Sequence, residues 1–418
     1  MKRKCLFILF LFFEIVNLQA KGFLVKDSAA YYDFIVDSLK YIQYPDSINH
    51  HRRDLFFDKL DSIVLCRQGK INILHIGGSH VQADFFSHTV RCHLDSINDD
   101  FFPSRGVIFP YKVAKTNNPT NYKVTSKGTW VTSKNVKKER MAQLGMTGIA
   151  VTTTDPNAEI SVKMDVDTTY RWNFTRICLL GYSDSLCIPY MVDTDSTYVY
   201  PTYDECTESY MFQFNGPRDS FVLRFKQLDS SPHPFTVCGF ITENDENGIV
   251  YHSIGVNGAS VPSYLSCENF QRDLNLIKPD MVIFGIGIND AVPQNFSEER
   301  FIARYDSLIG EIEKINPNCF FIFVTNNDSY RKVRQNKRVS YVVNRNGLKA
   351  EHAFYTLAKK YEGGYWNLFG WMGGLESMRQ WEINGLAQKD KIHFTKKGYK
   401  LIGDVFYNAL ILSYLEKE

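Results

Sequence analysis

A serine lies where a short apolar segment of the chain changes into a helical pattern. Residues 71–76 are mostly apolar and partly β-branched, and Gly77 and Gly78 separate them from Ser79. This composition predicts a buried strand followed by a tight turn. A serine at that edge of a sheet, with its backbone N–H at a helix N-terminus, could act as a nucleophile. The alternative is that Ser79 only caps the following helix.

An aspartate and a histidine near the C-terminus could complete such a site. Asp390 and His393 are three residues apart, just before a helical pattern over residues 397–415. If the two residues share one turn, the carboxylate can hold the imidazole in one tautomer. The imidazole can then act as a general base. The alternative is an ordinary loop aspartate and a histidine whose polar atoms are satisfied elsewhere.

Two further groups follow apolar segments and could bind an oxyanion. Gly258 follows residues 249–254, and its missing side chain lets a backbone N–H approach a ligand closely. Asn289 follows residues 281–285 and offers a side-chain amide. Each is also ordinary turn chemistry. Together they place a serine, a glycine, an asparagine and an Asp-x-x-His pair at one sheet edge, which predicts a serine hydrolase site.

The elements that must position these residues alternate between strands and helices. Helical spacing covers residues 28–67, 264–276, 298–315, 348–361 and 397–415, and buried strands are predicted over residues 71–76, 249–254, 281–285 and 319–324. Such alternation indicates a parallel sheet with helices on both faces. From about residue 117 to 243, short alternating segments rich in Thr, Val, Tyr and Phe predict an inserted antiparallel β-sandwich.

We therefore expect four segments. They are a signal peptide over residues 1–20, a first α/β segment over 21–116, the inserted sandwich over 117–245, and a second α/β segment over 246–418. Basic residues 2–4 precede a short apolar run, and Ala20 offers a cleavage point, so we expect a cleaved signal and a periplasmic or secreted protein without a stable membrane span. Removal of this segment leaves a formally neutral chain, which argues against a nucleic-acid partner.

Export permits disulfide bonds among the eight cysteines that follow the signal. Four of them lie in one region, which is compatible with bridges there, although the pairing cannot be deduced. They are Cys178, Cys187, Cys206 and Cys238. No cysteine or histidine cluster has the spacing of a zinc site, and we expect neither a metal nor a cofactor.

Four sequence blocks resemble those of the SGNH hydrolases, also called GDSL-like esterases. They are Gly77-Gly78-Ser79, Gly258, Gly287-Ile288-Asn289-Asp290 and Asp390-Lys391-Ile392-His393. The resemblance implies a three-layer α/β/α fold. It also implies Ser79 as nucleophile, His393 as general base and Asp390 as the residue that orients it. The backbone N–H groups of Ser79 and Gly258 and the side chain of Asn289 would form the oxyanion hole.

The chain departs from that family at Gly78, where the family usually has an aspartate whose hydrogen bonds help fix the turn. A closer resemblance, to bacterial peptidoglycan O-acetylesterases, rests on the Ser-His-x-x-Ala-Asp run at residues 79–84, on residues 104–110 and 366–374, and on Trp381. In those enzymes the insert resembles a carbohydrate-binding module. The resemblance implies removal of O-acetyl groups from a polysaccharide, and it favours peptidoglycan as that polysaccharide.

Two alternatives remain open from the sequence. One is acetyl transfer to a sugar hydroxyl by the same residues, and the other is a catalytically silent carbohydrate-binding protein, motivated by Gly78. Three residues near Ser79 could shape its pocket, although capping and surface roles are favoured for them: His80, Gln82 and Asp84. Four aromatic residues of the insert could stack on sugars or pack in the core: Trp130, Trp172, Tyr198 and Tyr200.

Overall fold

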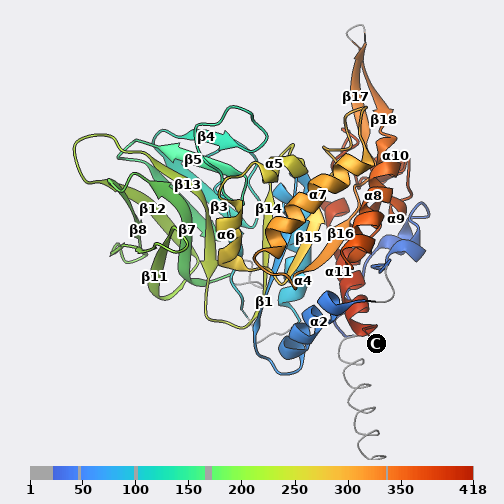
Figure 1. Ribbon diagram of the computed structural model, residues 1–418, viewed down its shortest axis with the longest axis horizontal. Helices are drawn as coiled ribbons and strands as arrows, with labels where there is room; N and C mark the ends of the chain where they lie inside the picture. The colour runs from blue at the N-terminus through green and yellow to red at the C-terminus, as the bar shows by residue number, and fades with distance from the viewer. Residues whose placement is uncertain (1–21, 46–48, 98–101, 165–171, 336–337, 418) are drawn as a thin grey trace, which may run out of the picture.

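The computed structural model describes residues 22–45, 49–97, 102–164, 172–335 and 338–417. Figure 1 shows an antiparallel β-sandwich beside a parallel sheet that is covered by helices on both faces, which confirms the predicted fold class. The expected signal peptide lies outside the described residues. Within the described ranges, no helix is both long enough and apolar enough to span a bilayer.

The parallel sheet has five strands, and the serine-bearing strand lies inside it. In spatial order they are β14 (Gly248–Gly255), β1 (Lys70–Gly77), β15 (Met281–Gly285), β16 (Phe320–Val324) and β19 (Gly364–Trp366). Every neighbouring pair is parallel, so the carboxyl ends of all five strands lie at one edge. We call this the catalytic edge, because each predicted site residue lies on a segment that follows a strand there.

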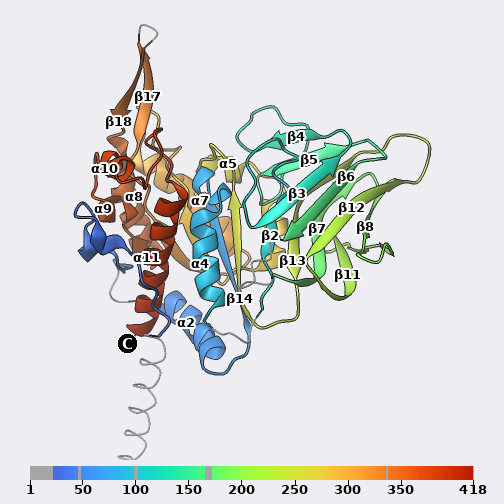
Figure 2. The ribbon, with the colours of Figure 1, turned by 180° about the vertical axis from the view of Figure 1, so that it is seen from behind.

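Successive side chains of the inner strands alternate between two hydrophobic cores. On β15, Met281 and Ile283 pack with α2, α4 and α11, whereas Val282 and Phe284 pack with α6, α7 and α8. The two helix layers are seen separately in Figure 1 and, from behind, in Figure 2. The bounds of these helices are α2 (His51–Val64), α4 (Phe85–Asp95), α6 (Phe270–Ile277), α7 (Glu298–Glu313), α8 (Asn346–Lys360) and α11 (Lys396–Leu415). Shorter helices are α3 (Ser79–Gln82), α5 (Val261–Leu265), α9 (Leu368–Trp371) and α10 (Met378–Ile383).

The sandwich consists of two antiparallel sheets. The first has the order β10 (Thr202–Asp204), β11 (Ser209–Arg218), β7 (Phe174–Ser183), β13 (Phe235–Glu243), β5 (Ile149–Thr153) and β4 (Val131–Lys134), and β2 (Gly106–Ile108) also pairs with β13. The second has the order β3 (Tyr122–Lys127), β6 (Glu159–Met164), β12 (Ser220–Gln227), β8 (Cys187–Val192) and β9 (Tyr198–Val199). One hydrophobic core runs from the sandwich into the α/β part, so the two parts pack together.

The predicted helical pattern over residues 28–67 is correct only in its second half. The first half contains two 3-10 turns, η1 (Ala29–Tyr31) and η2 (Asp37–Leu39), before α2 begins at His51. Gln43 instead exchanges two backbone hydrogen bonds of 2.8 Å with Tyr365 at the outer strand β19. Pro45 follows at once and disfavours helix at Tyr44. The spaced apolar residues of this segment therefore anchor an irregular chain over the second core.

All eight cysteines within the described residues are free, so the structure contains none of the bridges considered for the sandwich. Cys178 and Cys238 lie buried on β7 and β13, and Cys187 is buried on β8. These three thiols pack in the core as small apolar groups, while Cys206 is exposed.

Candidate active site

Ser79 lies directly after β1, on a turn that packs tightly over the catalytic edge. The last residue of β1, Gly77, is in register with Gly255 of β14 and Gly285 of β15. A Cβ atom on Gly255 would meet the backbone of α3, and one on Gly77 would collide with Val81. Gly77 and Gly255 therefore let α3 begin directly above the strand ends.

The side chain of Ser79 is turned to His393 and does not cap the helix. Gly78 is the N-cap of α3, without a side-chain capping bond, and Ser79 is the first helical residue. The Ser79 Oγ atom lies 2.7 Å from Nε2 of His393. The structure thus brings together two residues that are 314 positions apart in the chain, and the alternative of a simple cap is wrong.

Asp390 holds the other side of the histidine ring. Its Oδ2 atom lies 2.7 Å from His393 Nδ1, and its Oδ1 atom accepts the backbone N–H groups of Ile392 and His393, each at 3.0 Å. Burial acts to raise the pKa of Asp390, but these hydrogen bonds hold the pKa below its usual value. An ionised Asp390 accepts the Nδ1 proton, which leaves Nε2 as an acceptor for the hydroxyl of Ser79.

Asn289 and Gly258 lie on two neighbouring loops of the same edge. Asn289 Nδ2 donates to the carbonyl of Ala259 over 2.8 Å, and Asp290 accepts the backbone N–H of Val261 over 3.1 Å. Gly258 has a φ of +85°, which other residues rarely adopt. The Ala259 carbonyl also faces Gly78. All five residues predicted for the site therefore belong to segments that meet at the catalytic edge.

The turn at Gly78 does not itself require a glycine. Its φ of −98° is open to any residue, and a Cβ atom would lie 3.4 Å from Asn289 Nδ2 and 3.5 Å from the Ala259 carbonyl. Both are ordinary contact distances. An alanine at position 78 would therefore fit beside the amide of Asn289.

We expect the neighbouring glycines to respond differently to alanine. Gly78→Ala should change the free energy of unfolding by less than about 1 kcal/mol, because its backbone is already compatible with alanine. Gly77→Ala should cost about 1–3 kcal/mol through its collision with Val81. Thermal unfolding of both variants measures the contrast, and equal losses would contradict it. Gly78→Asp should likewise fold, so its esterase activity reports directly on the missing carboxylate.

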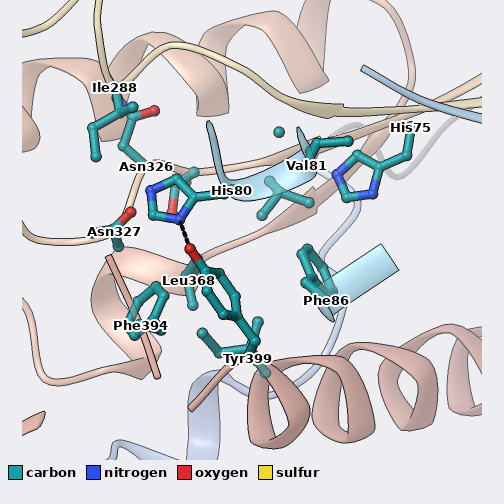
Figure 3. Close-up of a pocket in the computed structure, with 14 residues that line it drawn as sticks. His75, His80, Val81, Phe86, Ile288, Asn326, Asn327, Leu368, Phe394 and Tyr399 are labelled. Carbon is teal, nitrogen blue, oxygen red and sulfur yellow. Dashed lines mark hydrogen bonds between the residues drawn. The ribbon is translucent and has the colours of Figure 1, made fainter. Parts of the chain in front are cut away.

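Beside the serine, His80 lines a small, mainly apolar cavity of about 40 Å³ (Figure 3). Its Nδ1 atom lies 2.8 Å from the hydroxyl of Tyr399, and its ring centre is 5.2 Å from that of His393. Burial and, secondarily, His393 lower the pKa of His80 to about 3. His80 is therefore neutral at pH 7 and does not repel the positive charge that His393 would acquire. Because its side chain lines this cavity and bonds to Tyr399, the surface role that the sequence favoured for His80 is wrong.

Asp84 and Gln82 are buried, so the favoured surface role is wrong for them, and Asp84 occupies the N-cap position of α4 without a side-chain capping bond. Asp84 is 2% exposed and has a left-handed φ of 55° between α3 and α4. Its carboxylate accepts hydrogen bonds from four side chains: Arg105 at 2.6 Å, Asn121 at 2.6 Å, Ser253 at 3.0 Å and Arg91 at 3.3 Å. Gln82 accepts the backbone N–H of Asn257 at 2.7 Å. The segment after Ser79 is thus locked to β14 and to the chain that enters the sandwich.

The four aromatic residues of the insert fall into two groups. Trp172 is buried and Trp130 packs against the first core, whereas Tyr198 and Tyr200 are exposed. The rings of both exposed tyrosines contact Tyr190. This small exposed aromatic cluster is compatible with contact to sugars, but the two tryptophans serve packing.

A known family model matches part of the chain. Residues 241–401 match the model of a family described as GDSL-like Lipase/Acylhydrolase. That range contains Gly258, Asn289, Asp390 and His393 but begins after Ser79, from which the sandwich strands separate it. No curated protein matches the chain.

Among solved structures that are similar to the chain, one shows the same fold over most of its length. A structure described as a peptidoglycan O-acetylesterase has a TM-score of 0.68 and 18% identity, covering 88% of this chain and 97% of its own. An acetylxylan esterase mutant from Geobacillus stearothermophilus has a TM-score of 0.31 and 19% identity, covering 39% and 73%. A GDSL-like lipase from Bacteroides thetaiotaomicron has a TM-score of 0.28 and 19% identity, covering 40% and 76%.

Proposed function

We propose that this chain, which carries a domain of the GDSL-like lipase/acylhydrolase family, is an exported serine esterase that removes O-acetyl groups from a polysaccharide. The observation that carries the proposal is the hydrogen-bonded chain from Ser79 through His393 to Asp390. We infer peptidoglycan as the substrate, supported by the similarity in fold to a peptidoglycan O-acetylesterase over nearly the whole length of both chains.

In the proposed mechanism, Ser79 Oγ attacks the carbonyl carbon of the acetyl ester while its proton passes to His393 Nε2. The bond from that carbon to the sugar oxygen then breaks, and His393 gives the proton to this oxygen, which leaves as a sugar hydroxyl. Water then attacks the carbonyl carbon of acetyl-Ser79 and gives one proton to His393. The bond from that carbon to Ser79 Oγ breaks, Oγ takes the proton back from His393, and acetic acid leaves and ionises to acetate in solution. Asp390 stabilises the positive imidazole in both steps.

The negative charge that develops on the carbonyl oxygen needs donors that are already in place. We assign this role to the backbone N–H groups of Ser79 and Gly258 and to the side chain of Asn289. Asn289 Nδ2 has two protons, and its bond to the Ala259 carbonyl uses one of them. That bond holds the amide in position, and the second proton is free to reach the oxyanion.

Acetate release tests the proposal directly. The purified protein should release acetate from O-acetylated peptidoglycan and should hydrolyse para-nitrophenyl acetate. Peptidoglycan that has been chemically de-O-acetylated is the control and should yield no acetate. If the protein cleaves neither ester, the proposed function is wrong. If it cleaves only the aryl ester, the esterase assignment stands and the peptidoglycan assignment fails.

Replacement of Asn289 tests the assigned oxyanion donor. Asn289→Ala should lower kcat for both esters by about 100- to 1000-fold with little change in KM, since the lost bond forms chiefly in the transition state. Asn384→Ala is the matched control, because Asn384 is exposed and its amide bonds only to the local Gln380 carbonyl at 2.8 Å. A loss of less than threefold in kcat for Asn289→Ala would contradict the assignment.

A further inference from the structure

A two-stranded hairpin stands out from the fold beside the catalytic edge. It consists of β17 (Tyr330–Gln335) and β18 (Arg338–Val343), which pair only with each other in the described sheets. Figures 1 and 2 both show the hairpin rising clear of the helices and of the sandwich. At about 3.4 Å per residue, strands of six residues reach about 20 Å from the body of the protein.

The base of the hairpin is joined to two of the loops that carry site residues. Tyr330 donates its backbone N–H to the carbonyl of Lys391 at 3.1 Å, between Asp390 and His393. At the other strand, Asn344 follows β18, and its side chain donates to the carbonyl of Ala291 at 3.2 Å, two residues after Asn289. The hairpin therefore rises from the rim of the active site.

The sequence of this hairpin carries charge of one sign. Residues 330–343 contain five lysines and arginines and no acidic residue, although the whole chain has a formal charge of only +2. Lys332 is exposed, and it lies opposite Tyr341 in the strand register. Further exposed lysines lie at position 389, directly before Asp390, and at positions 396 and 397, at the start of α11. Nearby Glu382 is ion-paired with Lys391. Exposed Glu376 also lies near Tyr330, but the hairpin, position 389 and the start of α11 together carry a local excess of basic side chains.

Apolar side chains are exposed on the same hairpin. Val339 and Val342 are each 45% exposed, and Val333 and Tyr341 are each 38% exposed. A two-stranded ribbon with open faces is marginally stable in water, so these side chains are better explained as contacts for an occupant. A glycan with carboxylates offers both the negative charge for the cations and the flat sugar faces for Tyr341. A membrane surface fits less well, because the hairpin lacks the large Trp, Phe and Leu side chains that insert into lipid.

We propose that the β17–β18 hairpin is a binding arm for an anionic glycan, which it holds so that an ester on the same glycan reaches Ser79. This inference rests on the proposed function and narrows its substrate to carboxylate-bearing chains. The arm contributes to polymer binding only, since a small ester reaches the serine without touching it. Reversal of the charge on the hairpin should therefore raise KM for the polymer and leave the hydrolysis of a small ester unchanged.

The test compares two charge-reversal variants with equal net charge. Arg331→Glu/Lys332→Glu alters the arm, and Lys278→Glu/Lys359→Glu alters exposed lysines that precede β15 and β19, at the opposite edge of the parallel sheet. In low salt, the arm variant should raise KM for O-acetylated peptidoglycan about tenfold, and the control variant should not. Both should retain wild-type kcat/KM for para-nitrophenyl acetate. Equal KM values for the polymer in the two variants would overturn the proposal.

Two further measurements keep the test decisive. If the arm double variant unfolds at a much lower temperature than the wild type, the single variant Lys332→Glu takes its place. A salt titration of the wild type provides a second, independent measurement. Between about 20 and 200 mM NaCl, KM for the polymer should rise severalfold while KM for the aryl ester stays constant. A polymer KM independent of both salt and Lys332 would overturn the proposal. So would arm-dependent binding to phosphatidylglycerol vesicles without any arm effect on the polymer, which would indicate a membrane contact.

Cosedimentation with O-acetylated peptidoglycan separates this proposal from the proposed function. It measures binding without hydrolysis, and Ser79→Ala should cosediment like the wild type. If the wild type proves inactive on esters but its binding still depends on Arg331 and Lys332, the esterase proposal fails and the binding arm stands. If the arm and control variants cosediment equally, the binding arm is wrong whatever the activity.

Discussion

Ser79→Ala is expected to lower kcat for both O-acetylated peptidoglycan and para-nitrophenyl acetate by about 10⁴- to 10⁶-fold. The reason is that the hydroxyl is the atom that forms the acetyl-enzyme, and no other hydroxyl shares its contact with His393 Nε2 among the described residues. The loss should be in kcat, because the oxyanion donors and the surrounding surface still bind the ester. Initial rates of acetate release and of nitrophenolate release measure it.

The control for this variant is another serine-to-alanine change on a helix. Ser96 is the C-cap of α4, and among the described residues its hydroxyl bonds to the Cys92 carbonyl at 2.9 Å. Ser96→Ala should retain full activity, and both variants should unfold within a few degrees of the wild type, since each loses about one hydrogen bond. If Ser79→Ala keeps a tenth or more of the wild-type kcat, Ser79 is not the nucleophile. If neither the wild type nor the variant releases acetate, the silent carbohydrate-binding protein is favoured instead.

The strands that carry the site were predictable from sequence because they are buried on both faces. β15 spans the predicted residues 281–285, and β16 begins one residue after its predicted start. Inner parallel strands of this kind are continuous apolar runs, and glycines end them where a helix must pack closely. The positions of Ser79, Gly258 and Asn289 followed from these strand ends, whereas the Asp390–His393 pair was found by its spacing just before the C-terminal helix.

The parts that sequence could not predict depend on contacts between distant segments. Asp84 resembles a polar surface residue locally, but Arg105 and Asn121, which pair with it, lie on the chain that leads to the sandwich. The one local feature of Asp84 is its place just before a helix, where aspartate is commonly a helix cap, so the sequence favours capping over burial. The hairpin β17–β18 was also missed, because its basic residues break the apolar alternation that marks a strand with one buried face.

Asp390→Asn is the second change for which we expect a large effect, a fall in kcat of about 10⁴-fold at neutral pH. The asparagine can keep its oxygen on the backbone N–H groups of Ile392 and His393, so the loop should persist. Its amide then faces His393 Nδ1 as a donor. The ring must take the tautomer with the proton on Nε2, which cannot accept the hydroxyl proton of Ser79.

Two observations distinguish this tautomer effect from a general loss of structure. The double variant Ser79→Ala/Asp390→Asn should be no slower than Ser79→Ala alone, because the two residues act as one unit. The carboxylate has a lowered pKa in the folded protein, so its stabilising contribution is present above the unfolded pKa of about 3.9 and is lost as the pH falls. The difference in Tm between Asp390→Asn and the wild type should therefore shrink below about pH 4. A difference that persists in acid would show that the asparagine damages the loop itself, and the loss of activity would then say nothing about the tautomer.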